Sequence, residues 1–178
     1  SHGHFDHLDS ETLGQWSNKT MKALTGLRMG QVLEGVNKYI AVQEAGWYQE
    51  FNLDESFRIY FLPAQHWNQR SLWDRNKMLW GSFLIEWGGR RIFFAGDSGL
   101  AGHFSEISKL FPPMDYCLLP IGAYKPPYVM KQNHMNPEEA VRAFHDLKGK
   151  VLIPMHYGTF DLADEPLGEP LRWMRRLE

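Results

Sequence analysis

The chain opens with Ser1-His2-Gly3-His4-Phe5-Asp6-His7, in which three imidazoles and one carboxylate lie within six positions. Neutral imidazole suits zinc, and a nearby carboxylate can bind a second cation or orient the ligands of the first. The period-two spacing sends His2 and His4 to one side of an extended segment and lets Asp6 and His7 turn toward another. A tag would carry an uninterrupted run of histidines. The segment therefore favours a metal site over a less ordered histidine cluster.

Four further segments place residues that can bind a metal at the ends of predicted strands or just before a predicted helix. They are Pro63-Ala64-Gln65-His66-Trp67, Phe94-Ala95-Gly96-Asp97-Ser98-Gly99, Asn133-His134-Met135-Asn136-Pro137 and Pro154-Met155-His156-Tyr157-Gly158. Loops at strand ends hold side chains on a rigid scaffold, and α/β folds gather their chemistry there. His66, Asp97, His134 and His156 therefore join the opening motif as candidate site residues.

Together these segments resemble the metallo-β-lactamase superfamily, and within it the branch of the N-acyl-phosphatidylethanolamine-hydrolysing phospholipase D and its bacterial relatives. The branch is indicated by Ala64-Gln65-His66-Trp67 and Asn136-Pro137-Glu138-Glu139-Ala140. Similarity also covers Ile121-Gly122-Ala123-Tyr124 and Met155-His156-Tyr157-Gly158-Thr159-Phe160, and so runs through nearly the whole chain. The resemblance implies one domain over residues 1–178 of class α/β, or α+β in some schemes. Its architecture would be an αββα sandwich, represented mostly by its C-terminal portion.

The resemblance also implies a pair of zinc ions with a shared carboxylate. The first ion would be held by His2, His4 and His66, the second by Asp6, His7 and His156, and Asp97 would bridge them. Ligand chemistry agrees, since three neutral imidazoles leave one position of a tetrahedral zinc open and a bridging carboxylate suits cations about 3.5–4 Å apart. A hydroxide shared by the metals would be the nucleophile, because zinc lowers the pKa of water toward about 7. Manganese or iron(II) are alternatives to zinc.

The position of the motif departs from the pattern of the family. The His-x-His-x-Asp-His segment normally follows several strands of the first sheet, whereas here it begins at residue 2 of a chain with no initiating Met. We therefore expect an N-terminally truncated domain. A ligand at a free terminus frays unless something holds it, so the half of the site formed by His2 and His4 could be empty.

His134 and Tyr124 are the candidates for contact with the substrate. His134 precedes a helix start with an Asn136 cap, Pro137 and Glu139. A helix N-terminus favours an anion such as a phosphate and tends to keep a nearby imidazole neutral. The resemblance favours a catalytic, substrate-facing His134 acting with Asp97 over a plain surface residue. Tyr124, in the Gly-Ala-Tyr loop, is predicted to line the substrate pocket, whereas Arg70 is predicted to form a structural pair with a carboxylate rather than to hold a phosphate.

The bond that is cleaved depends on the resemblance alone. A pair of metals stabilises the oxyanion from phosphodiesters, lactones, thioesters and amides alike. The phospholipase branch favours a small-molecule or lipid phosphodiester, and a lactonase or another ester or amide hydrolase is the alternative. A redox diiron protein usually has an acidic residue where His4 stands, so His4 argues for zinc hydrolysis. A non-catalytic metal-binding fragment is the third reading.

Composition restricts the remaining classes. The 178 residues are 43% hydrophobic and 14% aromatic, enough to bury a substantial core. A net charge of −2 gives no nucleic-acid footprint. The sequence contains no apolar run long enough to span a membrane and no signal-peptide pattern, so we expect a cytoplasmic protein, with a homodimer as one option. Cys117, the single cysteine, lies in an apolar run and is predicted to be a buried structural thiol.

Hydrophobic periodicity predicts the order of the elements. Strands are expected at residues 57–62, 79–87, 90–95, 116–121 and 151–155, and helices at residues 9–24, 31–39 and 137–147. Gly88-Gly89 permits a tight hairpin turn between the second and third strands. The continuous apolar runs at 116–121 and 151–155 predict strands buried on both faces.

Overall fold

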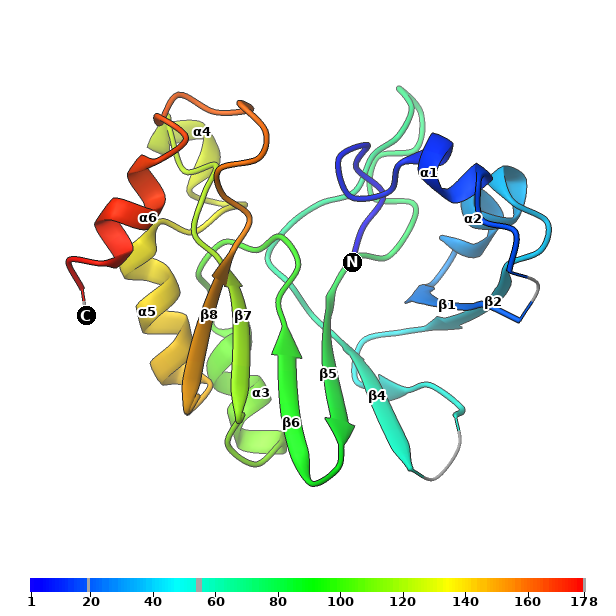
Figure 1. Ribbon diagram of the computed structural model, residues 1–178, viewed down its shortest axis with the longest axis horizontal. Helices are drawn as coiled ribbons and strands as arrows, with labels where there is room; N and C mark the ends of the chain where they lie inside the picture. Colours follow the sequence, from blue (N-terminus) through cyan, green and yellow to red (C-terminus); the bar gives the residue numbers. More distant parts are fainter. Residues whose placement is uncertain (19, 54–55, 178) are drawn as a thin grey trace.

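The computed structural model describes residues 1–18, 20–53 and 56–177, which form two sheets and several short helices (Figure 1). The larger sheet has the order β3-β4-β5-β6-β7-β8. Its strands are β3 (Gln49–Glu50), β4 (Phe57–Leu62), β5 (Ser82–Trp87), β6 (Arg90–Phe94), β7 (Tyr116–Pro120) and β8 (Val151–Met155). Neighbours from β3 to β6 are antiparallel, whereas β6, β7 and β8 run parallel.

The predicted hairpin is confirmed. Trp87 pairs with Arg90, which leaves Gly88 and Gly89 as a two-residue turn. Both glycines have positive φ, 56° and 73°, as the favoured two-residue hairpin turn with positive φ at both positions requires. The turn fixes the register of β5 against β6, so that Leu84 and Phe93 face the same side of the sheet.

Helices cover one face of the larger sheet. They are α3 (His103–Leu110) and α5 (Pro137–Asp146). The helix α6 (Glu169–Met174) packs against α5, and the short α4 (Pro127–Met130) lies near the upper end of the sheet (Figure 1). Leu84, Phe93 and Leu119 from the strands pack with Phe104 and Ile107 of α3, and all five are fully buried. Cys117 lies in the same cluster, and burial raises the pKa of its thiol to about 12, as expected for a structural thiol.

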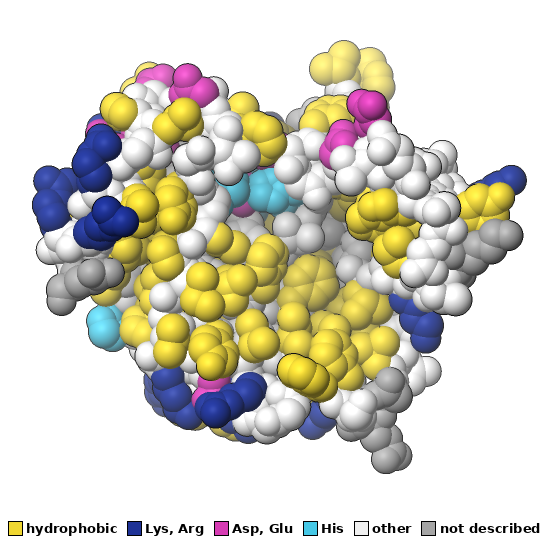
Figure 2. Space-filling model, viewed as in Figure 1, with side chains coloured by type: hydrophobic (Ala, Val, Ile, Leu, Met, Phe, Trp, Pro, Cys, Tyr) yellow, Lys and Arg dark blue, Asp and Glu magenta, His cyan; other side chains and the backbone are white. Residues whose placement is uncertain are grey.

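The opposite face of β6, β7 and β8 is apolar and largely uncovered by described residues. Figure 2 shows this hydrophobic surface over the sheet. Val151 and Ile153 of β8 are 45% and 40% exposed. The prediction that residues 151–155 are buried on both faces is therefore wrong, because β8 is the edge strand and helices cover only one of its faces.

The prediction of a helix over residues 9–24 is wrong beyond Gly14. α1 (Ser10–Gly14) begins at the predicted cap, where the Asp9 carboxylate accepts the N–H of Thr12 at 2.8 Å, but it ends at Gly14. β1 (Lys22–Gly26) follows and pairs in parallel with β2 (Ala41–Ala45). This pairing between distant segments overrides the local helical pattern.

The two remaining predicted helices are confirmed with small changes at their ends. The predicted helix at 31–39 is α2 (Gly30–Val36), which connects β1 to β2. α5 begins at the predicted position, where the Asn136 side chain accepts the N–H of Glu139 and the Glu139 side chain accepts the N–H of Asn136. Among the described helices, none combines the length and apolar character needed to cross a membrane.

Candidate metal centre

The candidate site lies at one end of the larger sheet, where three strands end and are followed by loops. His66 follows β4, Asp97 follows β6 and His156 follows β8 directly. These three strands run in the same direction, so their carboxyl ends meet at one edge. The N-terminal segment crosses this edge, and Figure 2 shows histidine side chains in the hollow above the sheet.

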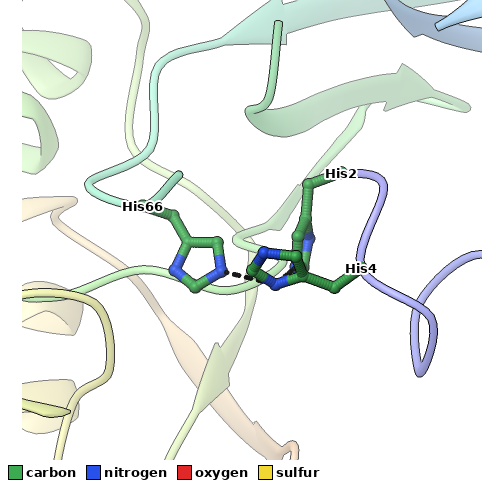
Figure 3. Close-up of side chains that lie close together, drawn as sticks. All are labelled: His2, His4 and His66. Atoms are coloured by element: carbon green, nitrogen blue, oxygen red, sulfur yellow. Dashed lines mark hydrogen bonds between the residues drawn. The ribbon is translucent and has the colours of Figure 1, made fainter. Parts of the chain in front are cut away.

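The first cluster contains His2, His4 and His66, whose rings converge from the N-terminal segment and the loop after β4 (Figure 3). Nδ1 of His4 lies 2.9 Å from Nε2 of His2 and 3.3 Å from Nε2 of His66. Burial lowers the pKa of all three rings, that of His66 to about 3, so each is neutral near pH 7. Nδ1 of His66 bonds to the carbonyl of Asn133 at 3.1 Å, which directs Nε2 into the cluster. Neutral imidazoles with converging nitrogens are the ligand form that zinc binds.

The second cluster contains Asp6, His7 and His156. Nε2 of His7 lies 3.4 Å from Oδ2 of Asp6 and 3.3 Å from Nε2 of His156. Burial opposes a charge on His7, but hydrogen bonds to Asp6 and Asp97 outweigh it and raise its pKa to about 9. In the metal-free chain His7 is therefore a cation at neutral pH. A metal bound by His7 would have to displace this proton.

Asp97 lies between the two clusters and is 4% exposed. Its Oδ2 is 3.9 Å from Nε2 of His2 and from Nε2 of His66, and 3.2 Å from Nε2 of His7. Its Oδ1 is 3.2 Å from Nε2 of His156. Burial alone would raise the pKa of this carboxyl, but His7 and His156 hold it well below its usual range. An ionised carboxylate that reaches both clusters has the position of a bridging ligand.

The donor set fits a pair of cations. Each cluster brings its ligand atoms within 4.8 Å of one another. Among the described residues, Nε2 of His4 is buried without a hydrogen-bond partner, and the same holds for Nδ1 of His134. Buried polar atoms without partners are rare in folded proteins, and at such a site they point to an ion or a ligand.

The ring of His134 lies beside Asp97 and His156. Its Nδ1 lies 3.9 Å from Oδ2 of Asp97, and its ring stacks on that of His156 with centroids 5.7 Å apart. Burial lowers the pKa of His134, so the ring is neutral. The side chain can therefore accept or donate a hydrogen bond at the open side of the centre.

Tyr124 does not reach the centre with its side chain. Its hydroxyl donates to Oε1 of Glu169 at 2.7 Å, and its ring packs edge-on against Trp173. The reason is that α6 lies behind this loop and offers both partners. Ala123, one residue earlier, lines the two cavities that lie beside His156.

Two residues after β4 hold the N-terminal motif in place. Asn68, fully buried, accepts the N–H of Gly3 at 3.0 Å. Arg70 donates to the carbonyls of Gly3 and Leu8 at 2.8 and 2.9 Å, and its guanidinium lies 4.4 Å from the centroid of the Phe5 ring. Arg70 is thus structural, as predicted, but its hydrogen-bond partners among the described residues are carbonyls and the Ser10 hydroxyl rather than a carboxylate. The role of Asn68 has no signal in the local sequence, because its partner lies 65 residues away.

Two cavities open beside His156. One, of about 180 Å³, is lined by Asp6, His7 and His156 and by the loop that follows His156. The other, of about 230 Å³, is lined by His4, Asp97 and His134 together with apolar side chains. The apolar members of this second cavity are Trp67, Ala123, Val129, Met130 and Leu162. A substrate can thus approach both clusters from a partly apolar recess.

Comparison with known sequences gives one family and several relatives. The family described as "Beta-lactamase superfamily domain" matches residues 1–157. N-acyl-phosphatidylethanolamine-hydrolyzing phospholipase D, mitochondrial, of Saccharomyces cerevisiae is 36% identical over 182 residues, which are 96% of this chain and 38% of that protein. A metal-dependent hydrolase of Listeria innocua is 32% identical over 171 residues, which are 93% of this chain and 68% of that protein. The chain spans less than half the length of several curated relatives that it matches.

Solved structures support the same fold. A novel metallo hydrolase from the archaeon Ignicoccus hospitalis matches with a TM-score of 0.69 and 24% identity over 99% of this chain and 70% of that chain. A diiron β-hydroxylase from Streptomyces venezuelae has the same TM-score at 20% identity, over 99% and 40% of the two chains. Matches at such low sequence identity are evidence for the same fold but not for the same reaction. With a family match over most of its length, this chain belongs to the beta-lactamase superfamily.

Proposed function

We propose that this chain carries the metal centre of a zinc-dependent hydrolase that cleaves phosphodiesters. The observation that supports it most is the place of Asp97, an ionised carboxylate between one cluster of three histidines and another of one aspartate and two histidines. The relative from Saccharomyces cerevisiae, a phospholipase D by name, supports the phosphodiester.

The residues of the chain divide the work. His2, His4 and His66 would hold the first zinc, and Asp6, His7 and His156 the second, with Asp97 shared. When bound, the zinc ions would supply Lewis acidity and water activated for attack. His134, neutral and at the open side of the centre, would donate a hydrogen bond to a substrate oxygen and orient the reacting group.

A phospholipid is the substrate class that the surroundings favour. Val129 and Leu162 line the cavity that holds His134, yet are 55% and 61% exposed. Phe160, 61% exposed, lines the other cavity. Large apolar side chains at the mouth of a polar centre suit a substrate with an apolar portion. A lactonase or another ester or amide hydrolase on the same centre is the second candidate.

The candidate ligands of this chain support a diiron centre less well than a zinc centre. The match to the diiron β-hydroxylase carries the fold alone. His4 brings a third imidazole to the first cluster, and a set of three imidazoles is the ligand set of hydrolytic zinc. An acidic residue would be expected there in the redox enzyme.

We also propose that the domain extends beyond these 178 residues. Helices cover only one face of this sheet, and the other face, over β6, β7 and β8, is also apolar; an apolar sheet face is normally buried against a further layer. The greater length of the relatives supports this extension. A cytoplasmic location and a homodimer stay predictions.

The decisive experiment combines metal content with turnover. Elemental mass spectrometry on the purified chain should give two zinc ions, and bis(p-nitrophenyl) phosphate should be hydrolysed until a chelator removes them. A panel of lactones, thioesters and long-chain phosphodiesters assayed in parallel identifies the bond. Iron with a visible absorption band, or two zincs with no phosphodiester turnover, would contradict the proposal.

A further inference from the structure

Glu165 lies in the loop between β8 and α6 and receives three successive backbone N–H groups from a different loop. Its side chain is buried, with 7% of its surface exposed. Oε1 accepts from Ala123, and from Tyr124 at 3.2 Å, while Oε2 accepts from Lys125 at 2.9 Å. Both oxygens of this carboxylate are thus engaged with the backbone, and charge-assisted bonds of this kind are strong.

The loop that Glu165 holds is strained and lies directly against a candidate metal ligand. Ala123 has φ of 62°, a left-handed conformation that a residue with a Cβ rarely adopts. A Cβ on Gly122 would come within 2.3 Å of the carbonyl oxygen of His156, so the two backbones are in contact. His156 itself has φ of 58°. Each of the two touching loops thus contains a left-handed residue, and such residues persist only where the surroundings fix them.

His156 connects this contact to the centre. Its Nε2 lies 3.2 Å from Oδ1 of Asp97 and 3.3 Å from Nε2 of His7. A shift of the loop that carries Ala123 would therefore move the backbone of His156 and change these distances. The first cluster is built from other segments, because His2, His4 and His66 come from the N-terminal segment and the loop after β4.

We infer that Glu165 is a positioning residue, which holds residues 122–125 against His156 and so sets the geometry of the second cluster. This inference rests on the proposed function, since it assigns the second cluster to a metal. Glu165 lines the smaller cavity, but its oxygens are bonded to the amides and not directed at the candidate ligands. Supporting groups of this kind typically change metal affinity by about 10–100-fold when removed.

The test compares zinc binding in three variants by titration against a chromogenic chelator. Glu165→Gln keeps the shape but replaces one acceptor oxygen by an NH₂ group, and Glu165→Ala removes both oxygens. Asp164→Asn is the matched control, because it removes an exposed negative charge from the adjacent residue. We expect the Glu165 variants to bind the second zinc about tenfold more weakly while the first zinc is unchanged, and the control to match the wild type.

Three results would overturn the inference. The first is that Glu165→Gln binds the second zinc with wild-type affinity. The second is that the Glu165 variants bind both zincs equally more weakly and have a lowered melting temperature. The third is that the wild-type chain takes up only one zinc. Should Glu165→Ala not fold, Glu165→Gln carries the comparison. If the wild type binds two zincs but hydrolyses no phosphodiester, the proposed reaction fails while the effect of Glu165 on zinc binding is still measured.

Discussion

Nε2 of His7 lies 3.2 Å from Oδ2 of Asp97, and this ion pair links the second cluster to the carboxylate shared with the first. The contact keeps a proton on His7 in the metal-free chain, since hydrogen bonds to Asp97 and Asp6 overcome burial and raise its pKa to about 9. Loss of the Asp97 carboxylate, or of the proton on His7, should therefore change the affinities for the two metals by different amounts.

Uptake of the second zinc should release a proton. His7 is charged below pH 9 in the metal-free chain and must be neutral to bind a metal, so affinity for the second zinc should fall as the pH falls, by about tenfold per pH unit below about 9. The first zinc binds His2, His4 and His66, whose lowered pKa values leave no proton to displace at pH 7. Calorimetry in two buffers of different ionisation enthalpy counts the protons. Equal release with both zincs would contradict the assignment of this proton to His7.

Asp97→Ala should remove the bridge. We expect the second zinc to be lost, because His7 and His156 lose the carboxylate that lies 3.2 Å from each. Hydrolysis should fall roughly a thousandfold or more, as several kcal/mol of charge stabilisation are removed. Zinc content by mass spectrometry and turnover of bis(p-nitrophenyl) phosphate measure both effects. Two zincs with normal turnover in this variant would exclude a bridged centre.

Arg70→Ala should loosen the first cluster. The change removes the bonds to the carbonyls of Gly3 and Leu8, which shape the segment that carries His4. We expect the first zinc to bind about tenfold more weakly. Lys77→Ala, in the same loop with an exposed side chain, is the control and should bind as the wild type does. The same chelator titration distinguishes the two zincs.

Gly122→Ala should destabilise the chain. Its new Cβ would lie 2.3 Å from the carbonyl oxygen of His156, so one of the two loops must shift. The free energy of unfolding should fall by about 1–3 kcal/mol, as in other overpacked sites. Gly102→Ala meets no atom within 4 Å and is the control. Denaturant unfolding of the metal-free protein measures both, and equal stability of the two variants would show that the loops can separate at little cost.

Short-range patterns in the sequence predicted the local features of this fold. The Asn136 cap, the hairpin at Gly88-Gly89 and the strand at 57–62 follow from short-range patterns, and each is confirmed. The candidate ligands were recognisable because they lie in short motifs. Lys22–Gly26, by contrast, forms a strand because it pairs with β2, which lies beyond α2 in the sequence. Residues 9–24 contain no local pattern that predicts this pairing.

The supporting residues could not be predicted for the same reason. Glu165 bonds to amides 40 to 42 residues away, and a backbone N–H has no sequence identity of its own. The bonds by which Asn68 and Arg70 hold Gly3 and Leu8 are likewise made to main-chain groups. A motif identifies the side chains that contact a ligand, whereas the groups that orient them are visible only once the chain is folded.

The candidate ligands extend from His2 to His156, so bound metals would join segments that lie far apart in the sequence, as a cross-link does. Such a link closes a long loop and removes conformational freedom from the unfolded chain. The ligands meet only after β4, β6 and β8 have assembled, because each strand delivers one of them. Zinc would therefore bind after the sheet has assembled and would stabilise it. Chelation should lower both the unfolding temperature and the cooperativity of unfolding.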